Sequence, residues 1–162
     1  MSPSSWPEPV ERVSRVLRAA AVEARIEELP AGTSTARAAA AAIGCDLSEI
    51  VKSLVFVCDG AYVLALVPGD RRADEAAVAA TLDASTVRVA RADEVEQATG
   101  FEPGGVAPFP QRAVAQTLID RSVLAHELVW IGAGTSSHLA VLPPSDLARL
   151  ARARPVDLTT RG

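Results

Sequence analysis

The sequence predicts an α+β protein, with a mixed α/β architecture in which helices surround a central mixed β-sheet that is partly barrel-like. A strongly apolar hairpin lies near the middle of the chain, and stretches with helical spacing alternate with short strands on both sides of it. The 162 residues, 49% of them hydrophobic, suffice for one domain with its own core. We therefore expect a single domain over residues 1–162, with loose termini at 1–8 and 155–162.

The first third of the chain contains two predicted helices separated by a strand. Apolar residues recur at helical spacing in the first helix. In the second, Thr and Ser at 33–35 can cap the helix "ARAAAAAI", and Gly44 ends it. The predicted elements are a helix over 10–24, a strand over 25–29, a helix over 36–43 and a helical turn over 46–50.

The hairpin is the clearest local signal. The apolar runs "IVKSLVFVC" (50–58) and "AYVLALV" (61–67) flank an Asp-Gly pair at 59–60, which favours a two-residue type I′ turn. This turn places Lys52 opposite Val67. Both faces of the hairpin are apolar, so we expect it to be central and covered on both sides.

The remaining elements follow from alternating patterns and breakers. A loop rich in Gly and Pro, "FEPGGVAPFP" (101–110), interrupts them. We expect helices over 73–82, 92–99 and 143–153, and strands over 86–90, 113–120, 127–133 and 137–142.

Composition excludes several classes of protein. The formal net charge of −4 and the pI near 5.2 argue against a polybasic nucleic-acid binder that grips many phosphates. No apolar run is long enough for a membrane span, and the first residues show no export signal, so we expect a cytoplasmic protein. Cys45 and Cys58 lack metal-site or redox spacing and are expected to be reduced, mostly structural thiols. We predict no metal and no cofactor.

Lys52 is the most unusual residue of the sequence. The chain has 15 Arg and one Lys, and that Lys lies within an apolar strand. One interpretation is a strand-edge Lys whose amine reaches water. The other is a functional cation in a narrow pocket, where burial lowers the pKa and a bulky planar Arg would not fit. The residues alone leave both interpretations open.

The other candidate features are weaker when each is taken alone. The glycines of the 99–110 loop permit close approach to a ligand, but a rigid connector is the favoured interpretation. His138, near a strand start, is favoured as a structural residue. Asp120, at a strand end, is slightly favoured as a turn cap. Ser136, His138 and Asp146 do not make a convincing triad, because no nucleophile elbow is present.

Several motifs in order resemble the YbaK/prolyl-tRNA synthetase-associated editing-domain family. This is the family of freestanding aminoacyl-tRNA deacylases. The most specific motifs are Lys52 followed by Ser53 and a GxxxP pattern from Gly104 to Pro108. The supporting segments are "VKSLVFVCDGAYVLALVPGD", "TGFEPGGVAPFP", "TLIDRSV", "VWIGAG" and "SDLARL".

The resemblance implies a trans-editing deacylase that hydrolyses the ester of a mischarged tRNA, of the tRNA(Pro) type and carrying a small amino acid. It implies the tRNA acceptor end as partner, with a prolyl-tRNA synthetase as a further partner. It makes Lys52 the catalytic residue. The substrate-binding residues that it implies are Ser53, Gly104, Gly105, Val106, Pro108, Asp120, Gly134 and His138.

The chain departs from the Cys-tRNA(Pro) deacylase pattern around "IGAGTSSHLAVL", which leaves the amino acid open and offers His138 as a pocket residue. Two alternatives remain beside the deacylase. One is a non-catalytic module that binds aminoacyl-tRNA ends or a synthetase. The other, which is weaker, is a Schiff-base enzyme that uses Lys52.

Overall fold

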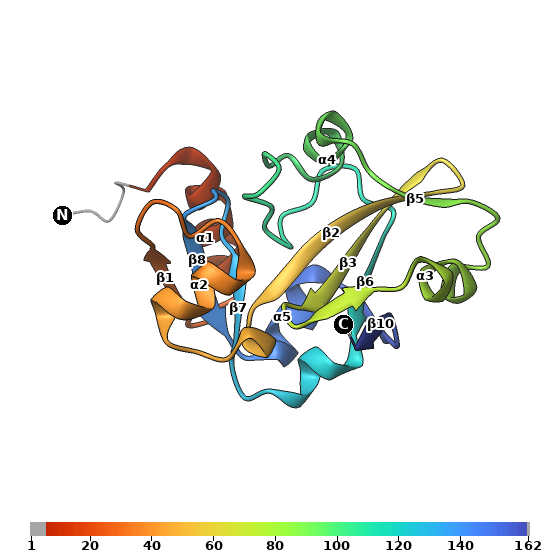
Figure 1. Ribbon diagram of the computed structural model, residues 1–162. Coiled ribbons are helices and arrows are strands. Elements are labelled where there is room, and N and C mark those ends of the chain that lie inside the picture. Colours follow the sequence, from red (N-terminus) through yellow and green to blue (C-terminus); the bar gives the residue numbers. More distant parts are fainter. Residues whose placement is uncertain (1–5, 162) are drawn as a thin grey trace.

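A computed structural model describes residues 6–161 (Figure 1). Its centre is a five-stranded sheet in the order β5-β2-β3-β6-β9. β2 pairs antiparallel with β3 and β5, whereas β3–β6 and β6–β9 are parallel, so the sheet is mixed as predicted. Its strands are β2 (Val51–Cys58), β3 (Ala61–Pro68), β5 (Val87–Val89), β6 (Gln116–Asp120) and β9 (Ala153–Val156).

Two smaller sheets complete the strand structure. The first has the order β1-β8-β7, and the second pairs β10 with β4. A parallel bridge between Ile50 and Trp130 links the start of β2 to β7, which gives the partly closed arrangement that the sequence predicted. The strands are β1 (Arg25–Glu28), β4 (Arg71–Ala73), β7 (Val129–Gly132), β8 (His138–Leu142) and β10 (Thr159–Arg161).

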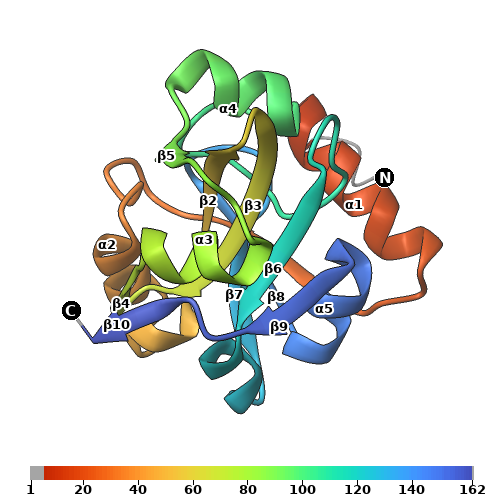
Figure 2. The same ribbon diagram turned by 90° about the vertical axis from the view of Figure 1, so that its right-hand side faces the viewer.

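Helices surround these sheets (Figures 1 and 2). No helix among the described residues is long and apolar enough to cross a membrane. The helices are α1 (Glu8–Ala19), α2 (Ala36–Ile43), α3 (Glu75–Leu82), α4 (Ala92–Thr99) and α5 (Pro144–Ala151), with short 3₁₀ turns η1 (Leu47–Glu49) and η2 (Arg121–Ala125).

The predicted hairpin is confirmed in register. Lys52 pairs with Val67, and the turn residues Asp59 and Gly60 have φ of 48° and 83°, as a type I′ turn requires. The Asp59 carboxylate accepts the N–H of Thr86 at 2.8 Å, which joins the turn to the segment before β5. The local signals for the hairpin were therefore sufficient to place it.

Both faces of the hairpin are covered, as the sequence indicated. On the Lys52 face, Val67 and Phe56 pack with Val78 of α3 and with Leu158 from the C-terminal segment. Figure 2 shows α3 in front of the central strands. The opposite face packs against β7, β8 and α1 in the largest core cluster. The double coverage explains why the hairpin sequence is apolar on both faces.

The second helix has the ends that the sequence predicted. The Thr35 hydroxyl accepts the N–H of Ala38 at 3.1 Å, and Gly44 ends α2 with a left-handed φ of 84°. The Thr and Ser residues before this helix also face the candidate site described below.

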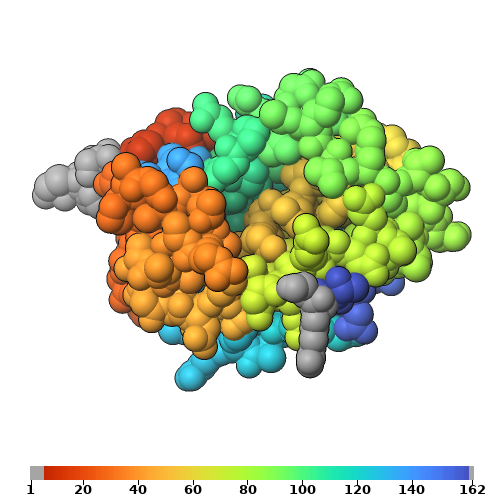
Figure 3. All heavy atoms as spheres, viewed as in Figure 1, coloured from red at the N-terminus to blue at the C-terminus, as the bar shows by residue number. Residues whose placement is uncertain are grey.

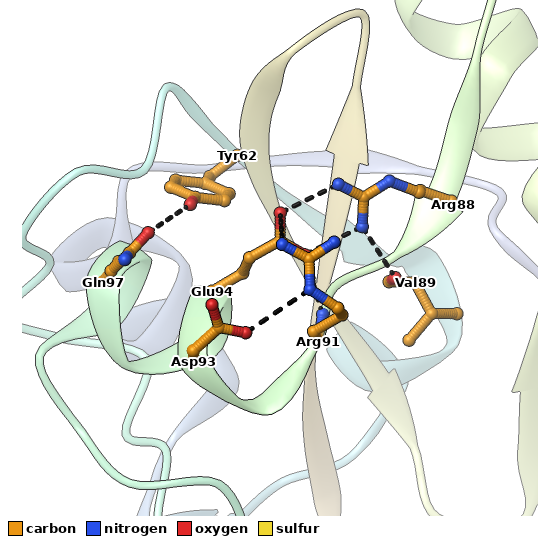
Figure 4. A network of polar contacts seen from close by, with 7 residues as sticks. All are labelled: Tyr62, Arg88, Val89, Arg91, Asp93, Glu94 and Gln97. Atoms are coloured by element: carbon orange, nitrogen blue, oxygen red, sulfur yellow. Dashed lines mark hydrogen bonds and ion pairs between the residues drawn. The ribbon is translucent and has the colours of Figure 1, made fainter.

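A network of ion pairs fixes α4 to β5 (Figure 4). The two guanidinium nitrogens of Arg88 donate to the two carboxylate oxygens of Glu94, each at 2.8 Å. The backbone N–H of Arg91 donates to the same carboxylate at 2.9 Å. These bonds, led by the one from the Arg88 side chain, lower the pKa of Glu94 from 4.5 to about 2. Each arginine of the network thus has a carboxylate partner.

The expectation of loose termini is wrong for most of these residues. Residues 1–5 lie outside the described residues, but α1 already begins at Glu8. Near the other end, β9 pairs with β6 and β10 pairs with β4. Leu158 between them is fully buried. The partners of these short strands are distant in sequence, so no local pattern indicated them.

Three other expectations differ from the structure. The first helix ends at Ala19 instead of continuing to residue 24, and the strand expected from residue 113 begins only at Gln116. The short strand β4 was not predicted. At Arg71–Ala73 it has three residues, too few for a periodic pattern.

Candidate active site

A cavity of about 320 Å³ opens beside the start of β2. Figure 3 shows the surface hollowed between the α2 side of the molecule, in orange, and the segment after α4, in green, with β2 at its floor. Three parts of the chain line it. They are residues 33–36 before and at the start of α2, residues 50–54 of β2, and the loops that contribute Gly104, Val106, Thr135 and Ser136.

Lys52 lies at the edge of this cavity and is partly buried. Its Nζ donates a hydrogen bond to the backbone carbonyl of Arg71 at 2.7 Å, which fixes the position of the amine. Burial lowers the pKa of Lys52 below its ordinary 10.5. Asp70 opposes this change, and Arg72 adds to it. The amine is thus held against the backbone of β4 and does not extend freely into water.

Ser53 follows Lys52 on β2 and also lines the cavity. Its Oγ is buried and has no hydrogen-bond partner among the described residues. Buried polar atoms are nearly always hydrogen-bonded in folded proteins. The Ser53 hydroxyl is therefore an unsatisfied group directly behind the cavity surface.

The Gly/Pro loop contributes Gly104 and Val106 to the cavity. Gly104 has a left-handed φ of 87°, which favours glycine. At Gly105 a Cβ would lie 2.7 Å from the Cα of Thr135, so only glycine lets this loop pack against the β7–β8 turn. Gly105 thus supports the cavity from behind without lining it.

The β7–β8 turn presents Thr135 to the cavity, and His138 holds that Thr in place. The His138 ring lies 4% exposed, and its Nδ1 is 2.5 Å from the Thr135 hydroxyl. Trp6 packs edge-on against the His138 ring, with centroids 5.5 Å apart. Gly134 allows close packing of this turn on Pro9. His138 and Gly134 therefore lie behind the cavity wall, and the expectation that His138 lines the pocket is wrong.

Two predicted binding residues lie away from the cavity. Pro108 is buried in its loop, where its carbonyl accepts a hydrogen bond from Gln111. Asp120 accepts the N–H of Leu158 at 2.7 Å and the hydroxyl and N–H of Ser122. Burial alone raises the pKa of Asp120, but these hydrogen bonds outweigh it and lower the pKa. Asp120 caps η2, as its interpretation as a turn cap predicted, and it also anchors the C-terminal segment, which the sequence did not indicate.

Sequence reasoning missed the hydroxyl groups of the cavity. Thr33, Ser34 and Thr35 line it from the start of α2, and Thr135 and Ser136 line it from the opposite side. The run at 33–35 was visible in the sequence, but it was interpreted only as a helix cap. Nothing local indicated that it faces β2.

Two further cavities adjoin the first. One, of about 190 Å³, is mostly apolar and shares Ser53, Leu54, Gly104 and Val106 with it. The other, of about 340 Å³, shares Lys52 and is lined by Arg37, Arg71 and Arg72 together with Asp70. Lys52 therefore lies between the hydroxyl-lined cavity and a strongly basic one.

The cavity wall limits the chemistry that it can support. The described residues lining the first cavity provide one cation, several hydroxyls and backbone groups, but no carboxylate and no imidazole. Within residues 6–161, no group of three or more His, Cys, Asp or Glu could hold a metal ion. Such a wall can bind and polarise a carbonyl group, and any proton transfer falls to Lys52, to water or to the substrate itself.

Comparisons with known proteins match the chain to one family. A family model described as an aminoacyl-tRNA editing domain matches residues 30–150. A proline–tRNA ligase of Lactobacillus gasseri is 35% identical over 91 residues, which are 56% of this chain and 16% of the ligase. A proline–tRNA ligase of Xanthomonas oryzae pv. oryzae is 32% identical over 134 residues, 80% of this chain and 24% of the ligase. The chain thus spans a quarter or less of these relatives.

A solved structure matches over nearly the whole chain. It is described as a candidate trans-editing enzyme for prolyl-tRNA synthetase, and it superposes with a TM-score of 0.88 at 33% identity. The match covers 96% of this chain and 99% of the other, so the two share the complete fold.

Proposed function

The chain belongs to the aminoacyl-tRNA editing domain family, and on that premise we propose that it is a trans-editing deacylase. It hydrolyses the ester that joins a wrong, small amino acid to the terminal ribose of a tRNA of the tRNA(Pro) type. It acts beside a prolyl-tRNA synthetase in the cytoplasm. The observation that carries the proposal is the single cavity at which Lys52, Ser53 and Gly104 meet.

The reaction requires modest help from the protein. Water attacks the ester carbonyl carbon, the bond from that carbon to the ribose oxygen breaks, and the ribose oxygen takes up a proton. The products are the free amino acid and the deacylated tRNA. Negative charge develops on the carbonyl oxygen as water adds, and a fixed cation or N–H donor there lowers the barrier. The Lys52 ammonium supplies that cation.

The other cavity residues bind and orient the aminoacyl group. The unsatisfied Ser53 hydroxyl and the backbone at Gly104 and Val106 offer polar contacts, while the hydroxyls of Thr33 and Thr135 face the same space. Because the wall holds no carboxylate or imidazole among the described residues, the substrate's own amine or ribose hydroxyl assists proton transfer. Gly105, Gly134 and His138 act indirectly, by holding the wall in place.

The chemistry of the cavity wall, and not its volume of about 320 Å³, bears on which amino acid is bound. A pocket can exclude a larger side chain by steric overlap, but one methylene group changes binding by only about 1–3 kcal/mol. An editing site that follows a synthetase site acts as a second sieve of this kind. The hydroxyl-rich wall is suited to a small or polar side chain.

A panel of tRNAs mischarged with Ala, Cys, Ser or Thr tests the proposal. We expect wild type to hydrolyse at least one ester well above the spontaneous rate, and Lys52→Ala to lose about 100-fold or more of that rate, as is typical when a transition-state donor is removed. Retained folding of the variant is checked by its melting temperature.

The outcomes separate the alternatives. If wild type binds these tRNAs but cleaves none of them, the protein is a binding module and the deacylase proposal fails. If borohydride traps a covalent adduct of Lys52 with a carbonyl compound, Lys52 acts as a Schiff-base residue instead.

A further inference from the structure

The basic cavity beside Lys52 contains cations that the deacylase chemistry does not use. Arg37 comes from α2, and Arg71 and Arg72 come from β4, so two distant parts of the chain converge here. Among residues 6–161, none of these three arginines forms an ion pair with a carboxylate of the protein. Asp70 is the one acidic residue that lines the cavity.

This concentration of charge runs against the composition of the chain. The protein has a formal net charge of −4, yet this cavity combines three arginines and Lys52 with a single carboxylate. Like charges that lie close together without partners repel one another and destabilise the fold. A bound anion removes that cost.

The fold brings the basic residues together by close backbone packing. At Gly69, just before β4, a Cβ would lie 2.7 Å from the carbonyl oxygen of Leu47 in η1. Glycine at this position lets the turn before β4 pack against η1, which follows α2. The carbonyl of Arg71 then accepts the Lys52 amine at 2.7 Å. The arginine cluster and the proposed catalytic cation are therefore parts of one local structure.

We propose that Arg37, Arg71 and Arg72 bind the phosphodiester groups on the 5′ side of the terminal nucleotide of the tRNA acceptor end. The inference rests on the proposed function, which places the ester at the adjoining cavity. In an aminoacyl-tRNA the ester and the last phosphodiester belong to the same nucleotide and lie on either side of one ribose. Lys52 lies between the two cavities in the corresponding way.

Arginine is suited to this role because its planar guanidinium donates paired hydrogen bonds to phosphate oxygens. Contacts to phosphate carry no sequence information, but they fix the register of a nucleic acid on the protein. A three-arginine site holds a short single-stranded end without gripping a whole tRNA. The acidic net charge of the chain is compatible with such a small contact.

The test uses two esters that differ in phosphate. One is an aminoacyl-adenosine without any phosphate, and the other is the same amino acid on a CCA trinucleotide, which has two phosphodiesters. We expect wild type to have a KM about tenfold or more lower for the trinucleotide ester. In an Arg71→Ala/Arg72→Ala variant this advantage disappears. The slope of log KM against log salt concentration for the trinucleotide ester also decreases, by about one or more. The Arg71 carbonyl that holds Lys52 is retained in this variant.

Hydrolysis of the adenosine ester is the internal control. At neutral pH its rate should change less than about twofold in the double variant, because that substrate has no phosphate and the effect of Arg72 on Lys52 is expected only at the alkaline end of the pH profile. Arg149→Ala is the matched control for charge, since Arg149 is an exposed arginine of α5 that pairs with Asp146. If the double variant keeps the trinucleotide advantage, or loses no more of it than Arg149→Ala, the phosphate site is refuted.

A binding measurement separates this proposal from the proposed function. If wild type cleaves neither ester, the deacylase proposal fails, and an uncharged acceptor-stem RNA hairpin ending in CCA then tests the arginines by fluorescence anisotropy. Binding that weakens about tenfold in the double variant and has a smaller salt slope supports the phosphate site. Equal affinity and equal salt slope in both proteins overturn it.

Discussion

The arginines of β5 and α4 and those of β4 and α2 occupy opposite electrostatic environments. Arg88 donates two hydrogen bonds to Glu94, and Arg91 lies within 3.5 Å of both Glu94 and Asp93. Arg71 and Arg72, by contrast, face a cavity without an ion-pair partner among the described residues. The paired group lies at β5 of the central sheet, and the unpaired group lies at β4 of the two-stranded sheet and at α2.

The difference shows what each group does. The charges of the α4 network compensate one another and fix a helix to a strand, so they require no bound ligand (Figure 4). The arginines around Lys52 form no ion pair that joins two elements among the described residues, and in our proposal they bind an external anion. Removing an arginine should therefore affect stability in one region and substrate binding in the other.

The largest expected effect concerns the cation that lies between the two cavities. Lys52→Arg keeps the positive charge but places a bulky planar group where a narrow amine is held by the Arg71 carbonyl. We expect single-turnover hydrolysis of a mischarged tRNA to fall about 100-fold or more, close to the loss in Lys52→Ala. A variant that retains more than about a tenth of the wild-type rate would show that charge alone is sufficient.

A second change converts the unpaired cluster into a paired one. Arg37→Glu places a carboxylate beside Arg71 and Arg72, at the first turn of α2 where a negative charge is favourable. We expect the KM for a mischarged tRNA to rise about tenfold, while the melting temperature stays equal or increases slightly. Arg37→Gln is the matched neutral variant and should have an intermediate KM. A lower melting temperature with an unchanged KM would mean that Arg37 stabilises the fold and does not bind the substrate.

Local sequence signals predicted the parts of the site that depend on local structure. The Asp-Gly turn at 59–60 fixed the hairpin register, and that register placed Lys52 on the strand as observed. Thr35 and Gly44 defined the ends of α2. Each of these features is determined by neighbours in the chain, so single residues carry enough information to predict it.

The remaining parts of the site depend on packing between distant segments. Thr135 lines the cavity because the Gly/Pro loop packs against its turn and because the buried His138 holds its hydroxyl. The role of Asp120 depends on Leu158, 38 positions later in the sequence. The basic cavity joins α2 to β4, a strand too short to be recognised from its pattern. No local sequence pattern predicts these contacts.

A third prediction tests the paired region. Glu94→Gln removes the carboxylate shared by Arg88 and Arg91, and we expect the melting temperature at neutral pH to fall by several degrees. The KM for mischarged tRNA should not change. Glu96→Gln, an exposed position on the same helix, is the matched control and should leave the melting temperature nearly unchanged.

The pH dependence of that loss has a defined sign. The pKa of Glu94 is lowered in the folded protein from 4.5 to about 2. Its contribution to stability is therefore present above about pH 4.5 and is lost as the pH falls toward about 2. The difference in melting temperature between wild type and Glu94→Gln should narrow over this range. A constant difference down to pH 2 would mean that the ionised carboxylate is not what stabilises α4.

The smallest expected effect concerns the titration of Lys52. If the ammonium form is required, the rate of hydrolysis has its full value well below the pKa of Lys52 and decreases as the pH rises through that pKa. Burial lowers that pKa below 10.5, Asp70 opposes the change, and Arg72 adds to it. Hydrolysis of the phosphate-free adenosine ester, corrected for the spontaneous rate, should therefore decline at lower pH in Asp70→Asn and at higher pH in Arg72→Ala than in wild type. Because the substrate has no phosphate, the change in the pH of this decline reports only the electrostatic field at the amine.

Two outcomes would contradict this prediction. The pH of the decline could move in the same direction in Asp70→Asn and Arg72→Ala, or the residual activity of Lys52→Ala could decline at the same pH as wild type. Either outcome would mean that another group titrates and that the unpaired arginines do not act on Lys52.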